Sequence, residues 1–217
     1  MIQRVRALPV VVGLLFLPSF SPAAKLPRLE LELLIRVATC EGGKPVKPRS
    51  WVKAHVDAAN RIFKAHAVEI RARTEDFRPA RCELSTRADR DGLAPHATPG
   101  KVVVLVVRRA RDVDLRSYDL MGVHWRFGGK SRALEGRRWI ILTARARPPV
   151  LAHELCHYLG LRHDPAGGNL MTPGPSDPVW RRKGRKPRRW KPLLTSAQAR
   201  KVRAAVARIA GGAPVAR

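Results

Sequence analysis

The sequence predicts a single mixed α/β domain in which helices pack against one twisted, mostly parallel β-sheet. Its 217 residues are enough for one domain with a substantial core. Short apolar runs typical of strands occur along the chain, together with longer segments of helical periodicity. The expected strands are 29–37, 68–73, 101–107, 121–127 and 138–144, and the expected helices are 50–65, 148–160 and one that begins at Thr195.

The expected strands differ in how strongly the sequence indicates them. Residues 101–107 hold five Val and one Leu in succession, which favours a strand buried on both faces. Residues 68–73 alternate apolar and polar side chains, and 121–127 end at the pair Gly128-Gly129. The first expected strand has an alternative interpretation, because Glu30 to Leu34 would also suit the start of a helix.

The expected helices carry recognisable end signals. Ser50 can cap the first helix, and Pro148 can open the second, which would end at Gly160. Thr195 and Gln198 have the spacing of a capping box at the start of the last helix. Residues 74–100 are polar and contain several Pro, so we expect a long surface loop there.

Residues 1–24 have the pattern of a secretory signal peptide. Arg4 and Arg6 precede an apolar stretch from Ala7 to Phe20, and small residues follow at 21–24. The mature domain would then comprise 25–217 and be secreted or periplasmic. The alternative is an uncleaved anchor, although the stretch is shorter than the about 20 residues that a membrane span needs. We expect no transmembrane segment in the mature chain.

The chain is strongly basic, with 43 Lys and Arg against 17 Asp and Glu. Such a charge favours contact with polyanions and opposes self-association, so we expect a monomer. A general bias toward Arg, Ala and Pro would produce the same composition, and the charge alone identifies no function.

Three cysteines in an exported protein allow one disulfide and one free thiol. Cys40 and Cys82 each follow an expected strand and lie in loop-like sequence, so we favour a bridge between them. Cys156 falls in an expected buried helix and would remain a thiol.

The strongest motif lies at residues 153–163. His153 and His157 are one helical turn apart, so both side chains leave the same face and can bind one metal ion. Leu151, Leu155 and Leu159 leave the opposite face. Gly160 can take the positive φ of a helix C-terminus, which would turn the chain and bring His163 back as a third ligand. Three imidazoles leave a fourth tetrahedral position for water, as in catalytic zinc sites.

This string, H-E-x-x-H-x-x-G-x-x-H, resembles that of the metzincin zinc metallopeptidases. The resemblance implies a secreted endopeptidase that binds Zn²⁺ through His153, His157 and His163. Glu154 would be the general base that takes a proton from the zinc-bound water. It also implies the metzincin-like arrangement of active-site helix, Met-turn and C-terminal helix.

Two further residues extend the resemblance. Asp164 directly follows the third His, which is most similar to the adamalysin (reprolysin) branch, and it would brace the turn by hydrogen bonds. Met171, in Asn169-Leu170-Met171, would form the Met-turn, an apolar floor beneath the ligands. No Tyr follows closely, so the tyrosine of some branches is absent.

Metzincins resemble one another in using the strand before the last one to bind substrate, which implies residues 121–127. The candidate substrate-binding residues are Gly122, Val123, His124 and Trp125. A protein or peptide substrate would bind in extended form along this edge. A plain sheet strand is the alternative, and His124 is expected at the surface rather than as a fourth ligand.

A basic segment, Arg181 to Lys191, holds eight Lys or Arg in eleven residues and includes Trp190. It would contact an acidic protein or another polyanion, or it is simply a solvated loop that Trp190 pins to the domain.

The sequence leaves two other functions of the protein open. One is a basic polyanion-binding protein with a structural zinc site, and the other is a metal-dependent amidase acting on cell-wall peptides.

Overall fold

The computed structural model describes residues 26–115, 117–173 and 190–212, which form a mixed α/β domain with a mostly parallel sheet. The expected signal peptide and most of the basic segment lie outside these residues. No helix in the described part of the chain is long and apolar enough to cross a membrane.

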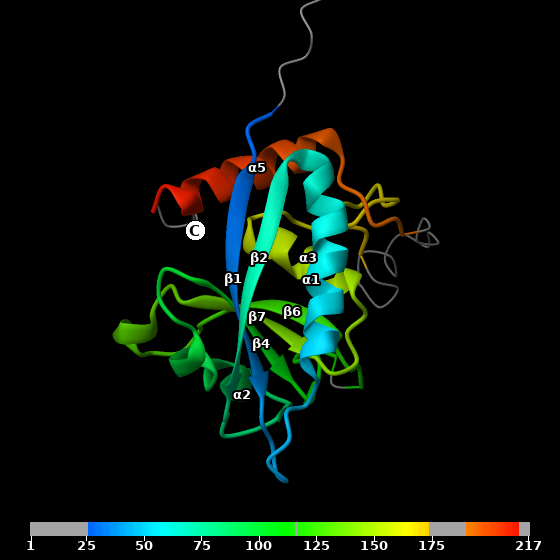
Figure 1. The fold of residues 1–217 in the computed structure, drawn as a ribbon. Helices are drawn as coiled ribbons and strands as arrows, with labels where there is room; N and C mark the ends of the chain where they lie inside the picture. The colour runs from blue at the N-terminus through cyan, green and yellow to red at the C-terminus, as the bar shows by residue number, and fades with distance from the viewer. Residues whose placement is uncertain (1–25, 116, 174–189, 213–217) are drawn as a thin grey trace, which may run out of the picture.

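Five strands form the central sheet, in the order β2-β1-β4-β7-β6 (Figure 1). They are β1 (Leu29–Ala38), β2 (Val68–Phe77), β4 (Val102–Val107), β6 (Gly122–Arg126) and β7 (Arg138–Thr143). The β1–β2, β1–β4 and β4–β7 pairs are parallel, and β6 runs antiparallel to β7. The segment 121–127 was expected to lie at an edge, and β6 is an edge strand of this sheet.

Among the described residues, three long helices cover one face of the sheet: α1 (Arg49–Phe63), α3 (Pro149–Tyr158) and α5 (Ser196–Ala210). Figure 1 shows α5 lying across one end of the sheet and α1 running along β2. The core on this face includes Leu151, Leu155 and Leu159 of the 151–159 segment, all buried against β4 and β7 side chains. The apolar face of α3 therefore packs on the sheet as its sequence predicts.

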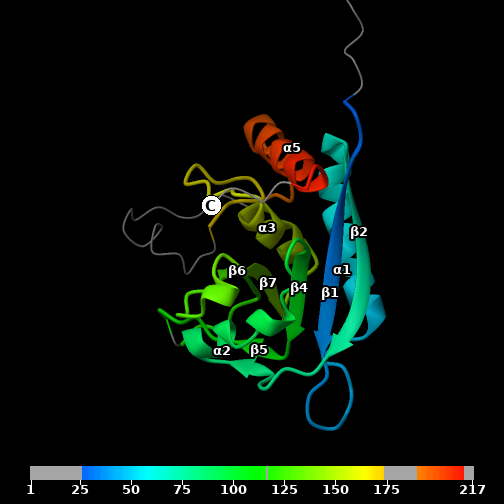
Figure 2. The same cartoon turned by 90° about the vertical axis from the view of Figure 1, so that its left-hand side faces the viewer.

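The opposite face of the sheet is covered by shorter elements, which Figure 2 shows at the lower end of the molecule. These are β3 (Glu83–Leu84), α2 (Arg87–Asp91) and β5 (Arg109–Ala110), with short 3₁₀ turns beside them. Buried Leu84, Leu93 and Ala94 form part of a second core with Leu105 and Ile141.

The prediction of a long loop over 74–100 was therefore wrong in part. Strand β2 continues to Phe77, and α2 begins at a capping box in which Thr86 and Asp89 exchange hydrogen bonds. The apolar residues here are too widely spaced to show a period, and they become buried only through contact with the sheet.

The helix ends also differ from the prediction in one place. Arg49 begins α1, and the preceding Pro48 rather than Ser50 occupies the N-cap position. The capping box of Thr195 and Gln198 is confirmed.

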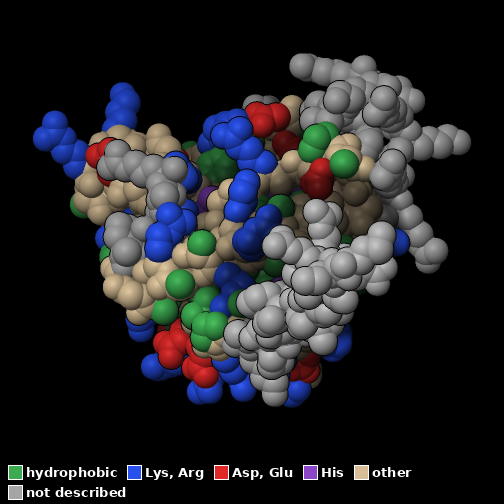
Figure 3. Space-filling view, turned by 90° about the horizontal axis from the view of Figure 1, so that it is seen from above, with side chains coloured by type: hydrophobic (Ala, Val, Ile, Leu, Met, Phe, Trp, Pro, Cys, Tyr) green, Lys and Arg blue, Asp and Glu red, His purple; other side chains and the backbone are tan. Residues whose placement is uncertain are grey.

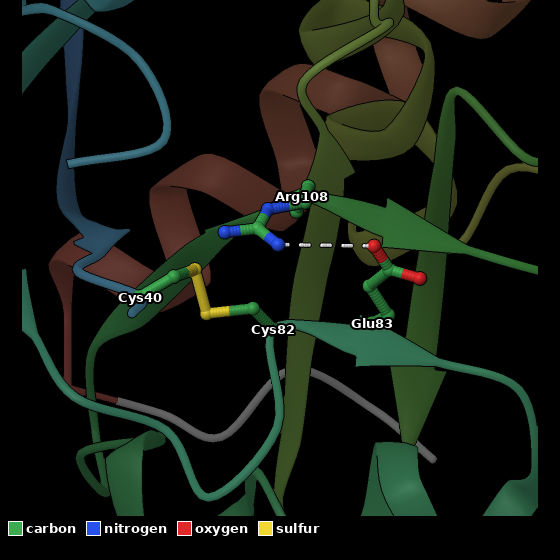
Figure 4. The surroundings of a disulfide bond; sticks show 4 residues. All are labelled: Cys40, Cys82, Glu83 and Arg108. Atoms are coloured by element: carbon green, nitrogen blue, oxygen red, sulfur yellow. Dashed lines mark ion pairs between the residues drawn. A yellow bond between two sulfur atoms is a disulfide. The ribbon is translucent and has the colours of Figure 1, made fainter. Parts of the chain in front are cut away.

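The expected disulfide joins Cys40 to Cys82, with their Cα atoms 6.0 Å apart (Figure 4). It links the segment after β1 to the start of β3, and an ion pair between Glu83 and Arg108 lies beside it. Cys156 is a buried free thiol in α3.

Replacing both Cys40 and Cys82 by Ser should lower the free energy of unfolding by about 2–5 kcal/mol, because the unfolded chain loses a cross-link. The two cysteines are 42 positions apart in the chain, so the bridge closes a long loop in the unfolded state. Thermal unfolding followed by circular dichroism measures the change. A reductant should lower the melting temperature of the wild type and leave that of the double variant unaltered. Equal midpoints for the two proteins would show that the bridge contributes no stability.

Candidate metal centre

Helix α3 and the turn that follows it bring three histidines together. His153 and His157 lie one turn apart on α3, and their Nε2 atoms are 3.1 Å apart. The Nε2 atom of His163 lies 3.3 Å from that of His153. Potential ligand atoms of the three residues all lie within 4.8 Å of one another.

The turn depends on Gly160, which has a φ of 93°. The Gly160 N–H donates to the carbonyl of His157, and the Leu161 N–H donates to that of Cys156. This is the hydrogen-bond pattern of a Schellman motif, which reverses the chain within two residues of the helix. A residue with a side chain would be strained at this φ.

The hydrogen bonds of the first two imidazoles leave their Nε2 atoms free to bind a cation. Nδ1 of His153 lies 2.8 Å from the carbonyl oxygen of Leu170, and Nδ1 of His157 lies 2.9 Å from that of Leu161. A carbonyl only accepts, so each Nδ1 carries the proton and each Nε2 presents a lone pair. These two Nε2 atoms have no proton to share, so their 3.1 Å contact is not a hydrogen bond.

A metal ion bound between the histidines would account for this contact. A cation bound tetrahedrally by imidazoles at about 2.0–2.1 Å holds its nitrogens about 3.3 Å apart. The observed spacings of 3.1 and 3.3 Å fit such a site. Burial is the main cause that lowers the pKa of His153 and of His157 to about 4, so both rings are neutral at pH 7. The three histidines thus fit a metal ion.

The loop that carries His163 is held by a network of polar side chains. The Asp164 carboxylate accepts from the Ala166 N–H at 2.9 Å and from the Asn169 side-chain amide at 2.6 Å. The Met171 N–H donates to Oδ1 of Asn169, and the Asp164 N–H donates to the Met171 carbonyl. Gln198 of α5 donates to both Asp164 and Asn169, at 3.4 and 3.3 Å.

Leu170 and Met171 lie in the part of this loop that contacts α3. Met171 and Leu170 are fully buried, and the Leu170 carbonyl is the acceptor for His153. The same carbonyl accepts a second hydrogen bond from the indole N–H of Trp190 at 3.2 Å. Trp190 therefore fixes the end of the basic segment against the candidate metal centre.

Glu154 lies on α3 beside the histidines and touches the edge strand. Its side chain is 6% exposed, and its carboxylate accepts a hydrogen bond from the backbone N–H of His124. A Cβ atom at Gly122 would stand 2.9 Å from Cγ of Glu154 and 2.7 Å from Cγ1 of Val150. Only glycine lets β6 approach α3 this closely. Burial raises the pKa of Glu154 to about 8, and a nearby cation would favour the ionised form.

The four candidate substrate-binding residues fall into two groups. Backbone hydrogen bonds from Thr143 to Met121 and from Phe127 to Arg137 show that odd-numbered residues of β6 face β7. The backbone groups of Gly122, His124 and Arg126 therefore point to the open edge. The side chains of Val123 and Trp125 pack on the sheet face opposite α3, where the Trp125 indole donates to Asp91.

His124 is neither a surface residue, as the sequence indicated, nor a member of the histidine cluster. It is partly buried, its ring stands edge-on to Tyr158, and its Nε2 is buried with no hydrogen-bond partner among the described residues. Burial, followed by the charges of Arg138 and His157, lowers its pKa to about 4. The roles of Tyr158, Arg138 and Gln198 around this site were not predicted from the sequence.

A separate hollow of about 640 Å³ lies beside the disulfide. It is lined by Cys40, Cys82, Gly42, Gly43 and three arginines, among other residues, and none of them belongs to α3, β6 or the turn that carries His163. The clustered histidines, rather than this hollow, mark the candidate site.

No protein-family model matches the chain, and no curated protein matches it. Among solved structures, a similar chain is that of mirolysin in complex with compound 9. The two sequences are 10% identical, with a TM-score of 0.47, and the match covers 64% of this chain and 65% of that chain. The function of this chain is therefore inferred from its own residues.

Replacing His163 by Ala should abolish tight metal binding, because two imidazoles alone leave the cation without its third ligand. Asp164→Ala should weaken binding by about tenfold or more, since residues that orient ligands commonly have effects of this size. Titration calorimetry with Zn²⁺ measures both affinities. Asp57→Ala is a matched control, because Asp57 is a carboxylate on α1 whose ion pair is with Lys53. Equal affinities for Asp164→Ala and Asp57→Ala would contradict a bracing role.

Glu154→Gln should raise the melting temperature of the metal-free protein more at pH 8 than at pH 5. The carboxyl group ionises near pH 4.5 in the unfolded chain and near pH 8 in the folded one. Ionisation thus favours unfolding increasingly between these values, and Gln removes the penalty. Protonation of His153 and His157 changes the stability of both proteins in the same way, so it does not contribute to the difference between their melting temperatures. Thermal unfolding in a chelator provides the measurement, and a gain independent of pH would contradict a buried, protonated carboxyl group.

Proposed function

We propose that this chain is a secreted zinc-dependent endopeptidase of the metzincin type, with Glu154 as the general base. The observation that carries the proposal is the convergence of three imidazole Nε2 atoms beside a buried carboxylate that touches an open sheet edge. A structural metal site has no use for such a carboxylate. The adamalysin branch, which rests on Asp164, stays a prediction.

Zinc is the ion proposed for this site. Its tetrahedral preference and its affinity for imidazole suit a site of three histidines. His153, His157 and His163 would hold it, and Met171 would lie below them as an apolar floor. When bound there, zinc would lower the pKa of a coordinated water and polarise the carbonyl of the bond to be cut.

Glu154 would move the proton during the reaction. The His124 N–H holds its carboxylate in one orientation, and Gly122 leaves the space in which the side chain lies. Ionised Glu154 takes a proton from the attacking water and passes it to the amine that leaves. Its burial limits the contact of the carboxylate with bulk water.

The substrate would be a protein or peptide in extended conformation along β6. This strand is an edge of the described sheet, with the backbone N–H and C=O groups of Gly122 and Arg126 and the C=O group of His124 on its open side, whereas the His124 N–H is bonded to Glu154. A peptide that pairs with these groups gains hydrogen bonds independent of its sequence. Val123 and Trp125 would then support the strand rather than contact the peptide.

Two other parts of the proposal concern the whole protein. Secretion is proposed from the signal-peptide pattern of residues 1–24, and the disulfide is consistent with it, because such bridges persist in oxidising compartments. A polyanion contact through Arg181 to Lys191 stays a prediction, because 181–189 lie outside the described residues. Trp190, at the end of this segment, bonds to the Leu170 carbonyl.

Glu154→Ala should retain zinc and lose at least about 100-fold of its activity on casein, because general-base catalysis commonly contributes that much. Dye-labelled casein with and without a chelator measures activity, and elemental analysis measures zinc. Glu135→Ala is a matched control, since Glu135 is an exposed carboxylate outside the site. Cleavage by Glu154→Ala at the wild-type rate would overturn the base assignment. Absence of chelator-sensitive cleavage by the wild type would favour the amidase or the structural zinc site.

A further inference from the structure

Positive side chains gather where β6 and β7 face the end of α3. Arg126 and Arg138 are directly opposite each other in the antiparallel pair, so their side chains leave the same face of the sheet. His124 leaves that face as well, two residues along β6. Like charges directly opposite on a sheet destabilise it, so this arrangement needs a compensating group.

No such group belongs to the described part of the chain. Within the described ranges, neither Arg126 nor Arg138 forms an ion pair with a carboxylate, although many other arginines do. Arg138 instead lies over the ring of Tyr158, with its Cζ atom 4.3 Å from the ring centroid, and shares a hydrogen bond with the Tyr158 side chain. Its guanidinium is thus fixed in place by Tyr158, and no carboxylate in the described ranges neutralises its charge.

Tyr158 connects this cluster to the candidate metal centre. It follows His157 on α3, is only 6% exposed, and has the His124 ring edge-on at 5.6 Å between centroids. His124 also has a buried Nε2 atom that lacks a hydrogen-bond partner among the described residues. His124 and Arg126 of the edge strand and Arg138 of the neighbouring β7 therefore lie on one face of the sheet, and Arg126 is the exposed member of the three.

A peptide added to β6 would place side chains beside Arg126, the exposed member of these groups. Alternate residues of an added strand point to the same sheet face as Arg126 and His124. Glu154, which marks the position of the reaction, contacts β6 at Gly122 and His124. Arg126 is two to four residues further along, so it would face a substrate residue about two to four positions from the bond that is cut.

We propose that Arg126, with Arg138 and His124 beside it, forms a subsite that selects an acidic residue, so that the substrates are peptides with Asp or Glu near the cleaved bond. This inference rests on the proposed endopeptidase function. A carboxylate can accept paired hydrogen bonds from a guanidinium, and it relieves the repulsion between the two arginines. The net charge of +26 attracts acidic chains from a distance, and Figure 3 shows that Lys and Arg side chains also gather at the end of the molecule where α5 lies.

A peptide-library cleavage profile of the zinc-loaded protein tests the proposal. Cleavage products identified by mass spectrometry should be enriched in Asp or Glu at one position within about four residues of the cut. For a matched pair of peptides, Glu at that position should exceed Gln by about tenfold in kcat/KM, the size of one charge-assisted hydrogen bond. Added salt should reduce the ratio, because Arg126 is exposed.

Variants at Arg126 identify the residue responsible. Arg126→Gln should reduce the Glu-to-Gln ratio to below about twofold, and Arg126→Glu should transfer the preference to Lys or Arg. Arg132→Gln is the control, because Arg132 is exposed and lies outside β6. Both Arg126 variants should keep the melting temperature and zinc content of the wild type, which separates loss of selectivity from loss of the fold.

The outcomes distinguish this inference from the function on which it rests. Glu154-dependent cleavage without acidic enrichment would overturn the subsite and leave the endopeptidase standing. An acidic preference that survives Arg126→Glu would also overturn the subsite. No cleavage of any library peptide by the zinc-loaded wild type would overturn the proposed function and the subsite with it.

Discussion

The hydrogen bond between Nδ1 of His153 and the Leu170 carbonyl joins the two halves of the candidate metal centre. One half is α3, which carries His153 and His157, and the other is the loop that carries His163. The bond fixes the tautomer of His153 and at the same time ties the loop to the helix. Asp164, Asn169 and Gln198 hold the loop from the other side. The geometry of the site thus depends on α5 as well as α3, although α5 contributes no ligand.

A second contact brings the site to the sheet. Gly122 has no side chain, so β6 lies directly against Glu154, and the His124 N–H bonds to the carboxylate. The strand that would bind the substrate and the residue that would act on it are therefore neighbours. On the far face, Trp125 is held by Asp91 and lies under Arg90, so α2 fixes the strand from behind. A short helix that is far from the histidines in sequence therefore helps to hold the candidate active site in place.

Much of this arrangement was predictable because several signals act locally. The run of Val at 102–107, the capping box of Thr195 and Gln198, and the spacing of His153, His157, Gly160 and His163 each determine a structure within a few residues. The disulfide was predictable because Cys156 belonged to a helix with a buried face. Elements between 74 and 100 were missed, since their stability comes from contacts with the sheet that leave no periodic pattern. The pairing of Arg126 with Arg138, and the packing of Tyr158 on both β strands, depends on register, which a single sequence does not specify.

The burial of Cys156 has a consequence for how the protein acquires its covalent structure. Three thiols allow three pairings, and only the one between Cys40 and Cys82 occurs in the folded chain. Cys156 is inaccessible once α3 has packed against the sheet, so it can no longer take part in thiol exchange. Oxidation after collapse therefore has one available outcome, whereas oxidation of an extended chain has three. The order of these two events decides whether the oxidised product is uniform.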